Sequence, residues 1–110
     1  MRNKVQSGNV ISVAAPALVL SGQGVLVGAL FGVASGDALQ GTSVEIAREG
    51  VFDLVANGAD TAAQGAKAYW DNTAKRITTT ATNNTLVGCF TADKTAAAST
   101  ARVLLDGVVR

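Results

Sequence analysis

The apolar positions of this 110-residue chain gather in short, valine-rich segments that are separated by glycine-containing turns. Strand-like segments that recur about every 8–12 residues, with turn signals between them, are typical of a sandwich or barrel. The pattern therefore predicts an all-β (mainly β) fold, a small β-barrel or sandwich of short strands. The predicted strands are 10–14, 25–34, 42–48, 51–56, 67–71, 76–82, 86–91 and 102–109.

Two segments show the alternation of apolar and charged positions that marks a half-buried strand. Val44-Glu45-Ile46 and Phe52-Asp53-Leu54 each place one charge between two apolar residues. Because side chains of a strand alternate between its two faces, that charge points outward while its neighbours point inward. Glu49-Gly50, which lies between these segments, either reverses the chain or bulges a single continuous strand.

Helical signals are weak and short. Residues 60–64 have the T-x-x-Q form of a capping box, but Gly65 follows at once, so they predict a single turn of 3₁₀ character. Residues 94–99 have helix propensity, yet so short a segment does not hold a helix without packing, and we expect a loop there. The fold should contain at most one or two short helical turns.

Glycine recurs at every fourth position of GVLVGALFGVA, at Gly24, Gly28 and Gly32. This spacing differs from the G-x-G-x-x-G of a dinucleotide loop, and the apolar run is much shorter than the ~20 residues of a membrane helix. What remains is a buried strand pair, broken near Gly28 or Gly32, whose glycines allow bulges, tight bends or close backbone approach. Because four is even, a strand keeps the three glycines on one face. The opposite face then carries an apolar row: Val25, Val27, Ala29, Phe31 and Val33.

Composition and charge exclude several kinds of partner. Nine basic and eight acidic residues give a net charge of +1, and no basic cluster exceeds Lys75-Arg76. We therefore expect neither nucleic acid nor a membrane surface as a partner. The chain has no histidine, the commonest metal ligand and the usual base beside a nucleophilic cysteine. Cys89 lies in an apolar run and is interpreted as a small buried hydrophobe.

The remaining polar residues form no catalytic pattern along the chain. Asp53, Asp71 and Asp106 stand apart in the sequence, calcium-loop spacing is absent, and the threonine run 78–80 suits a solvent face. We therefore expect no catalytic residue, cofactor, metal or small-molecule substrate. One alternative stays open, a small hydrolase or carbohydrate-binding domain with a deep pocket that converges on one of these aspartates.

At this length one core suffices, so residues 1–110 are interpreted as a single domain. The N-terminus only faintly resembles a signal peptide, because polar residues separate its charges from the apolar run, Pro16 interrupts that run and no small-x-small site follows. We interpret it as part of the mature domain, with residues 1–7 either a flexible docking arm or a frayed end. Large side chains are few, and oligomerisation compensates for a modest core.

Three stretches stand in a recognisable order and spacing: GNVISVAAPA at residues 8–17, GALFGVA at 28–34, and GAKAYWD at 65–71 with KRITTT at 75–80 and NTLVG at 84–88. Together they resemble the phage capsid cement family, small head-decoration proteins of tailed bacteriophages and prophages. The last strand, RVLLDG at 102–107, fits as well. The residues that we single out as its structural motif are Tyr69, Trp70, Asp71, Gly24, Gly28 and Gly32.

The resemblance implies a mostly β, non-enzymatic protein that binds the outside of the assembled head and bridges neighbouring major capsid subunits. It also implies that the protein is a homotrimer on the capsid surface of the virion. During assembly the protein is expected in the cytoplasm of the host bacterium. Another virion module, such as a head-fibre base or a tail component, is the alternative. Tyr69 and Trp70 are adjacent on a strand, so one anchors the core while the other covers an edge or a subunit contact. The sequence does not indicate which residues contact the capsid.

Overall fold

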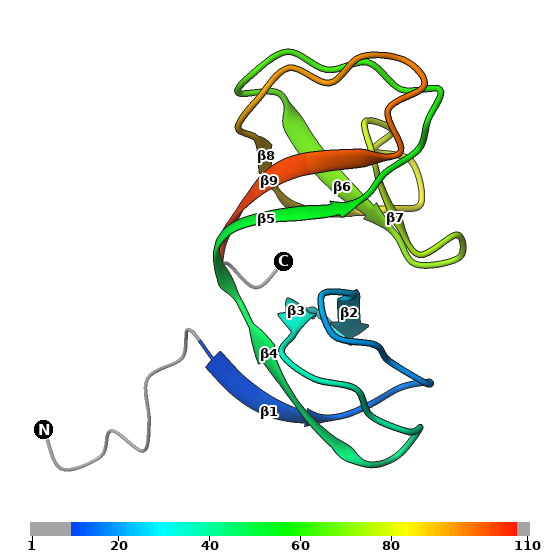
Figure 1. Ribbon diagram of the computed structural model, residues 1–110, viewed down its shortest axis with the longest axis vertical. Helices are drawn as coiled ribbons and strands as arrows, with labels where there is room; N and C mark the ends of the chain where they lie inside the picture. The colour runs from blue at the N-terminus through cyan, green and yellow to red at the C-terminus, as the bar shows by residue number, and fades with distance from the viewer. Residues whose placement is uncertain (1–9, 108–110) are drawn as a thin grey trace, which may run out of the picture.

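The computed structural model describes residues 10–107, which form nine strands in two antiparallel sheets (Figure 1). These residues include no helix, so the fold is all-β as the sequence predicts. The strands are β1 (Val10–Ala14), β2 (Gly24–Val27), β3 (Leu30–Ala34), β4 (Ser43–Ala47), β5 (Glu49–Val55), β6 (Lys67–Asp71), β7 (Arg76–Thr78), β8 (Thr85–Phe90) and β9 (Thr100–Asp106).

The first sheet has the strand order β1-β4-β3-β2 and forms the lower lobe in Figure 1. Its strands β2 and β3 make a hairpin in which Val27 pairs with Leu30 and the turn consists of Gly28 and Ala29. Gly28 has a φ of +59° and Ala29 does not have a positive φ, which fits a type II′ turn with glycine at its first position. The chain therefore breaks at Gly28, one of the two positions that the sequence allowed.

This turn overturns the apolar row expected along one face of residues 25–33. Reversal at Gly28 places Val25 on one face of the hairpin and Phe31 on the other. Gly24 shares the face of Phe31, whereas Gly32 lies opposite Val25, so the three glycines do not share a face either. The prediction was wrong because it carried the period of one strand through a turn.

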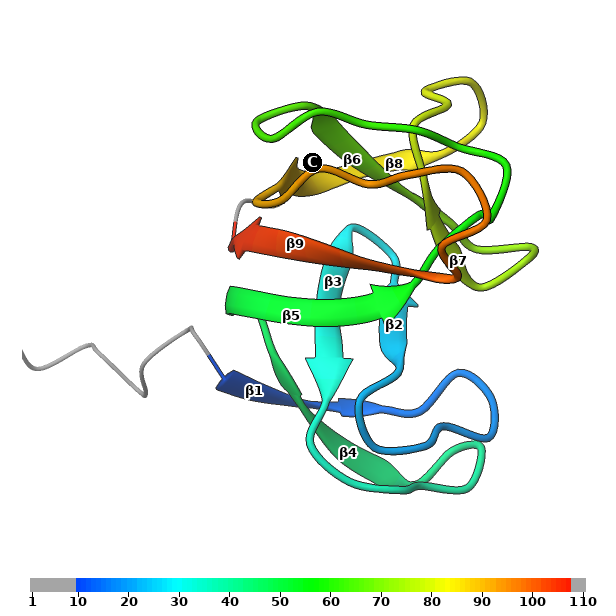
Figure 2. The same cartoon turned by 45° about the horizontal axis from the view of Figure 1, so that its top comes forward.

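The second sheet has the order β5-β9-β8-β6-β7. Its longest ladder joins β5 and β9, from Glu49 opposite Asp106 to Val55 opposite Thr100. β8 and β6 pair with a register shift near Ala68. In Figure 2 the hairpin of β2 and β3 runs across the direction of β5 and β9, so that the two sheets pack over each other at this point.

One length of chain belongs to both sheets, because β4 leads directly into β5 (Figure 1). Arg48 alone separates the two strands, and Gly50 has a φ of +122°. Glu49-Gly50 therefore does not reverse the chain but bends a nearly continuous strand from one lobe into the other. The alternation predicted in β4 is confirmed, since Val44 and Ile46 are buried on either side of an exposed Glu45.

The hydrophobic core has two parts, and the hairpin contributes to both. The larger cluster lies on the second sheet and receives Phe31 and Val33 from β3. The smaller cluster lies on the first sheet and receives Val25 and Ala34 from the hairpin's other face. The hairpin is therefore the packing element that joins the two lobes.

The helical turn expected at residues 60–64 does not form. Ala62 instead makes an isolated antiparallel bridge with Lys94, which lies in the other segment where helical character was considered. The pairing of these two loops satisfies backbone groups that a short helix would otherwise have satisfied locally.

Candidate functional site

Trp70 is the centre of the motif singled out in the sequence, and it lies in the core. Its side chain is only 2% exposed, and its ring centroid is 5.0 Å from that of Phe31 on β3. Its Nε1 donates a hydrogen bond to Oδ1 of Asn72 at 3.1 Å, which satisfies the one polar atom of the indole. Tyr69 points to the opposite face of β6 and is half-buried. Trp70 thus links the second sheet to the hairpin.

Asp71 shapes the turn between β6 and β7. Its Oδ1 accepts hydrogen bonds from the backbone N–H of Thr73 at 2.9 Å and of Ala74 at 3.1 Å, which is the geometry of an Asx turn. The turn ends at Lys75, whose φ is +58°, an unusual value for a residue with a side chain. The Nζ of Lys75 donates to Oδ1 of Asn72 at 2.8 Å, the oxygen that Trp70 also uses.

The three glycines of the motif occupy three different environments. A Cβ atom on Gly24 would lie 2.7 Å from Cη2 of Trp70, so glycine allows this ring to rest against β2. A Cβ atom on Gly32 would lie 2.8 Å from the backbone oxygen of Ala47. Gly28 has open space around it and serves the turn. Two of the glycines therefore permit close approach and the third permits a positive φ.

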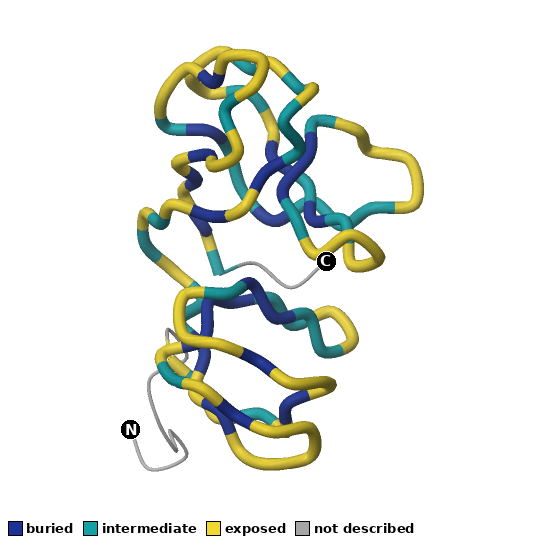
Figure 3. Tube along the Cα trace, turned by 45° about the vertical axis from the view of Figure 1, so that its right-hand side comes forward, coloured by how far each residue is buried: buried dark blue, intermediate teal, exposed yellow. Residues whose placement is uncertain are grey.

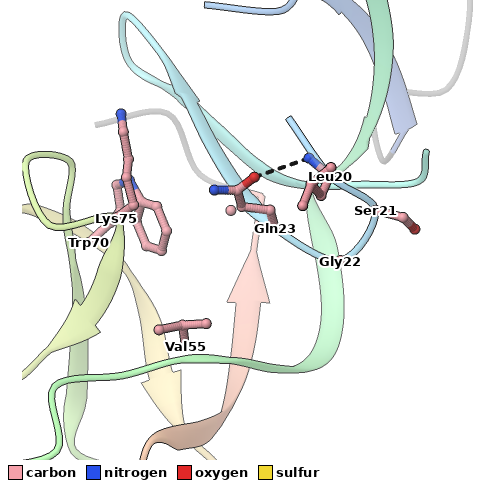
Figure 4. A pocket seen from close by; sticks show the side chains of 8 residues that line it. Leu20, Ser21, Gly22, Gln23, Val55, Trp70 and Lys75 are labelled. Atoms are coloured by element: carbon pink, nitrogen blue, oxygen red, sulfur yellow. Dashed lines mark hydrogen bonds between the residues drawn. The ribbon is translucent and has the colours of Figure 1, made fainter. Parts of the chain in front are cut away.

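A cleft of about 310 Å³ opens between the start of β2 and the turn that joins β6 to β7. Figure 4 shows Trp70 and Lys75 on one side of it, Leu20 and Gln23 on the other, and Val55 below them. A smaller hollow continues from it between β2, Leu18 and Lys75. The cleft thus forms where the two lobes face each other.

The rim of this cleft is apolar and exposed. Leu20 is 55% exposed and Val55 is 60% exposed, and Leu18 in the adjoining hollow is 61% exposed. Figure 3 shows that the loops of the first lobe are exposed over much of their length. Lys75 is the one charged side chain among the described residues that line the cleft and the hollow. The cleft therefore combines a concave shape with exposed apolar side chains.

A second polar cluster fastens the long loops of the second lobe. The Asp60 carboxylate accepts hydrogen bonds from Oγ1 of Thr78 at 2.7 Å and from the N–H of Thr79 at 3.0 Å. Lys94, which is buried, donates from Nζ to the backbone oxygen of Asp60 at 2.7 Å. Burial raises the pKa of Asp60, but these hydrogen bonds and the charges of Lys94 and Arg76 outweigh it and hold the pKa below its ordinary value. Thr78 is buried, so the solvent face assigned to it was wrong.

The three aspartates considered for catalysis take separate positions in the fold. Asp53 on β5 pairs with Arg102 at 3.0 Å on the exposed face, and the hydrogen bond from that guanidinium holds the pKa of Asp53 below its usual range. Asp71 is engaged in its turn, three strands away from β5, and Asp106 ends β9 opposite Glu49. None of the three lines the cleft beside Trp70.

Other candidates for chemistry are equally dispersed. Among residues 10–107 no three cysteine, aspartate or glutamate side chains cluster as metal ligands. The same part of the chain has no helix long and apolar enough to cross a bilayer. Cys89 is half-buried rather than buried as interpreted from its apolar surroundings.

The sequence indicated Trp70 but not the cleft beside it. The walls come from residues 20–24, from Val55 and from the turn after β6, and no local pattern connects these segments. The available signal was the juxtaposition of the single tryptophan with the turn-forming Asp71. This pattern indicated the wall of the cleft that contains Trp70. The opposite wall is formed only when the two lobes pack together.

A model of the phage cement protein family matches residues 5–105. The match includes all nine strands, short of the last residue of β9. No curated protein and no solved structure matches the chain.

Proposed function

This chain belongs to the phage cement protein family, and from that membership we propose that it decorates the outside of the phage head and stabilises it by bridging neighbouring major capsid subunits. Membership gives the protein a capsid-associated structural role. The family match carries the proposal, because it spans both sheets instead of a single motif. Catalysis has no part in the proposed role.

The bridging part of the proposal is supported by the distribution of exposed apolar residues. Leu39, 68% exposed, lies in the first lobe, and Val51, 54% exposed, lies on β5 in the second. A protein that contacts two neighbouring subunits needs two such surfaces. Many copies on one shell also gain from avidity, so each contact can be weak.

We further propose that the protein acts as a homotrimer, as the resemblance implies. Among the largest fully buried side chains only Trp70 and Phe90 are aromatic, so the described core is modest. Association of several copies adds stability to a small domain of this kind. Light scattering of the purified protein should give three times the mass of one chain. A mass of one chain at high concentration would contradict the trimer in solution.

The N-terminal residues 1–7 lie outside the described residues, and we propose that they act as a docking arm. The single domain of residues 1–110 is likewise a proposal, supported by the hairpin that packs into both core clusters. During assembly the protein is proposed to be in the bacterial cytoplasm and to reach the virion with the head.

Sedimentation with heads tests the proposed function. The purified protein, at micromolar concentration, is mixed with expanded empty heads of its own phage that lack it, and the heads are pelleted. We expect the protein in the pellet and a higher temperature of head disruption. Protein that remains in the supernatant, with no change in the disruption temperature, would refute the decorating role.

A further inference from the structure

We propose that the cleft between β2 and the turn after β6 is a docking site for a short acidic segment of the phage capsid protein. The inference rests on the proposed function, because it names the part of the partner that one surface of a cement protein receives.

The size and lining of the cleft fit a few side chains of a partner. Its volume of about 310 Å³ is at the small end of the range of ligand sites, so it accepts a short segment and not a whole domain. Leu20 and Val55 on its rim are each more than half exposed. A partner that covers them removes apolar surface from water, which favours binding.

Charge selects an acidic partner. Lys75 supplies the single charge of the described lining, and its Nζ is held at 2.8 Å by Oδ1 of Asn72 beside the ring of Trp70. An ammonium with three donors retains two for a carboxylate after this bond.

The backbone of β2 supplies further hydrogen-bonding groups. Val27 and Leu30 flank the two-residue turn and therefore exchange hydrogen bonds with each other. By the alternation of an antiparallel ladder, Leu26 and Gly24 direct their N–H and C=O groups away from β3. Gly24 is buried against the ring of Trp70, but Leu26 is half-buried and lines the adjoining hollow together with Lys75, so an extended segment that places its carboxylate on Lys75 meets backbone groups of β2 at Leu26.

The charge of the N-terminal residues argues against that segment as the occupant, whether it comes from the same chain or from a second copy. The first nine residues carry Arg2 and Lys4 and no acidic residue, so they repel Lys75. An acidic capsid segment is attracted by the same charge.

Three variants test the docking site with the protein and heads used above. Lys75→Glu reverses the charge, Lys75→Gly removes it and also relieves the positive φ, and Lys67→Glu makes the same charge change at an exposed position of β6 away from the cleft. We expect binding to heads to weaken at least about tenfold for both Lys75 variants and to stay unchanged for Lys67→Glu. Because glycine suits the positive φ of this turn, we expect Lys75→Gly to fold, and an unchanged far-UV circular dichroism spectrum separates lost binding from unfolding.

A blocked Val-Asp-Val peptide provides a probe independent of heads. Trp70 is the one tryptophan of the chain, so its emission reports on the cleft. We expect Val-Asp-Val to shift this emission saturably in the wild type, whereas Val-Lys-Val, and Val-Asp-Val added to Lys75→Glu, leave it unchanged.

The outcomes separate this inference from the proposed function. Wild-type affinity for heads in both Lys75 variants would overturn the docking site and leave the decorating role intact. Wild-type protein that does not pellet with heads would refute the decorating role and, with it, a capsid segment as occupant. A changed oligomeric state of Lys75→Glu would assign the cleft to a contact between copies and would likewise overturn the inference.

Discussion

At the scale of single residues, the closest packing in the candidate site is between Gly24 and Trp70. A Cβ atom at Gly24 would meet Cη2 and Cζ3 of the ring at 2.7 and 2.8 Å, so Gly24→Ala forces the ring or β2 to move. We expect this variant to lose about 1–3 kcal/mol of unfolding free energy, the range for overpacked cores, and to change the emission of Trp70. Chemical denaturation followed by that emission measures both effects.

Gly36 offers a matched control for this substitution. Its φ is not positive, and a Cβ atom added there would have no other atom within 4 Å, so Gly36→Ala should leave stability and emission nearly unchanged. Equal stability of the Gly24→Ala and Gly36→Ala variants would mean that the close approach at Trp70 does not constrain the hairpin.

Asp60 gives the protein a dependence on acid. Its pKa in the folded state lies below the ordinary value of 3.8, so the unfolded state binds the proton first as the pH falls. The stabilisation is therefore complete above pH 3.8 and is lost as the pH falls through that value toward the lower folded pKa. Asp60→Asn should lower the unfolding free energy by about 1 kcal/mol at neutral pH, because it removes one charged acceptor, and should flatten the acid limb of stability against pH.

The control for the acid dependence is Glu45→Gln, which alters an exposed carboxylate on β4. Thermal unfolding across pH 2 to 7, roughly the range in which carboxyl groups titrate, compares the two variants. If the stability of Asp60→Asn falls as steeply at low pH as that of the wild type, the hydrogen bonds of Asp60 do not cause the loss of stability in acid.

At the scale of elements, the short valine-rich segments predicted most of the strands. Residues 10–14 and 67–71 form strands with the predicted bounds, and turns flank residues 67–71 on both sides. In residues 25–34 two glycines could each break the strand, and only the pairing of Val27 with Leu30 decides for Gly28. The predicted strand 76–82 ends at Thr78, since the Asp60 carboxylate takes the hydroxyl of Thr78 and the N–H of Thr79.

The cleft and the loop cluster could not be predicted in the same way. Both join segments far apart in the sequence, and period-two patterns carry no information on which loop meets which strand. Lys94 illustrates the limit, because nothing in its alanine-rich surroundings marks a buried ammonium that binds carbonyl oxygens.

The hairpin of β2 and β3 predicts how the two lobes unfold. Phe31 packs into the larger core cluster and Val25 into the smaller one. We expect Phe31→Ala and Val25→Ala each to lower the unfolding free energy of the whole domain by about 1–3 kcal/mol. Each variant should therefore lower the midpoint of one unfolding transition that both lobes share. Far-UV circular dichroism and Trp70 emission should report the same midpoint for each variant.

Separate transitions would contradict this coupling. If Val25→Ala changed the circular dichroism transition but left the Trp70 transition in place, the lobes would unfold independently. The hairpin would then belong to one lobe alone, and residues 1–110 would not behave as a single cooperative domain.

At the scale of the whole molecule, the family and the two-lobed shape support a protein that acts through its surfaces. Exposed apolar residues lie on both lobes and around the cleft between them. The resemblance in the sequence predicted the family, and the match over residues 5–105 confirms it. The faces that meet the capsid depend on the partner's shape and charge, which this chain's sequence does not contain.

Electron cryomicroscopy of heads saturated with the purified protein tests the bridging role most directly. The account predicts density for the two-lobed domain on the outer surface, repeated over the whole shell, in groups of three that each touch more than one major capsid subunit. Density confined to a vertex or the tail, or single copies that each touch one subunit, would contradict it.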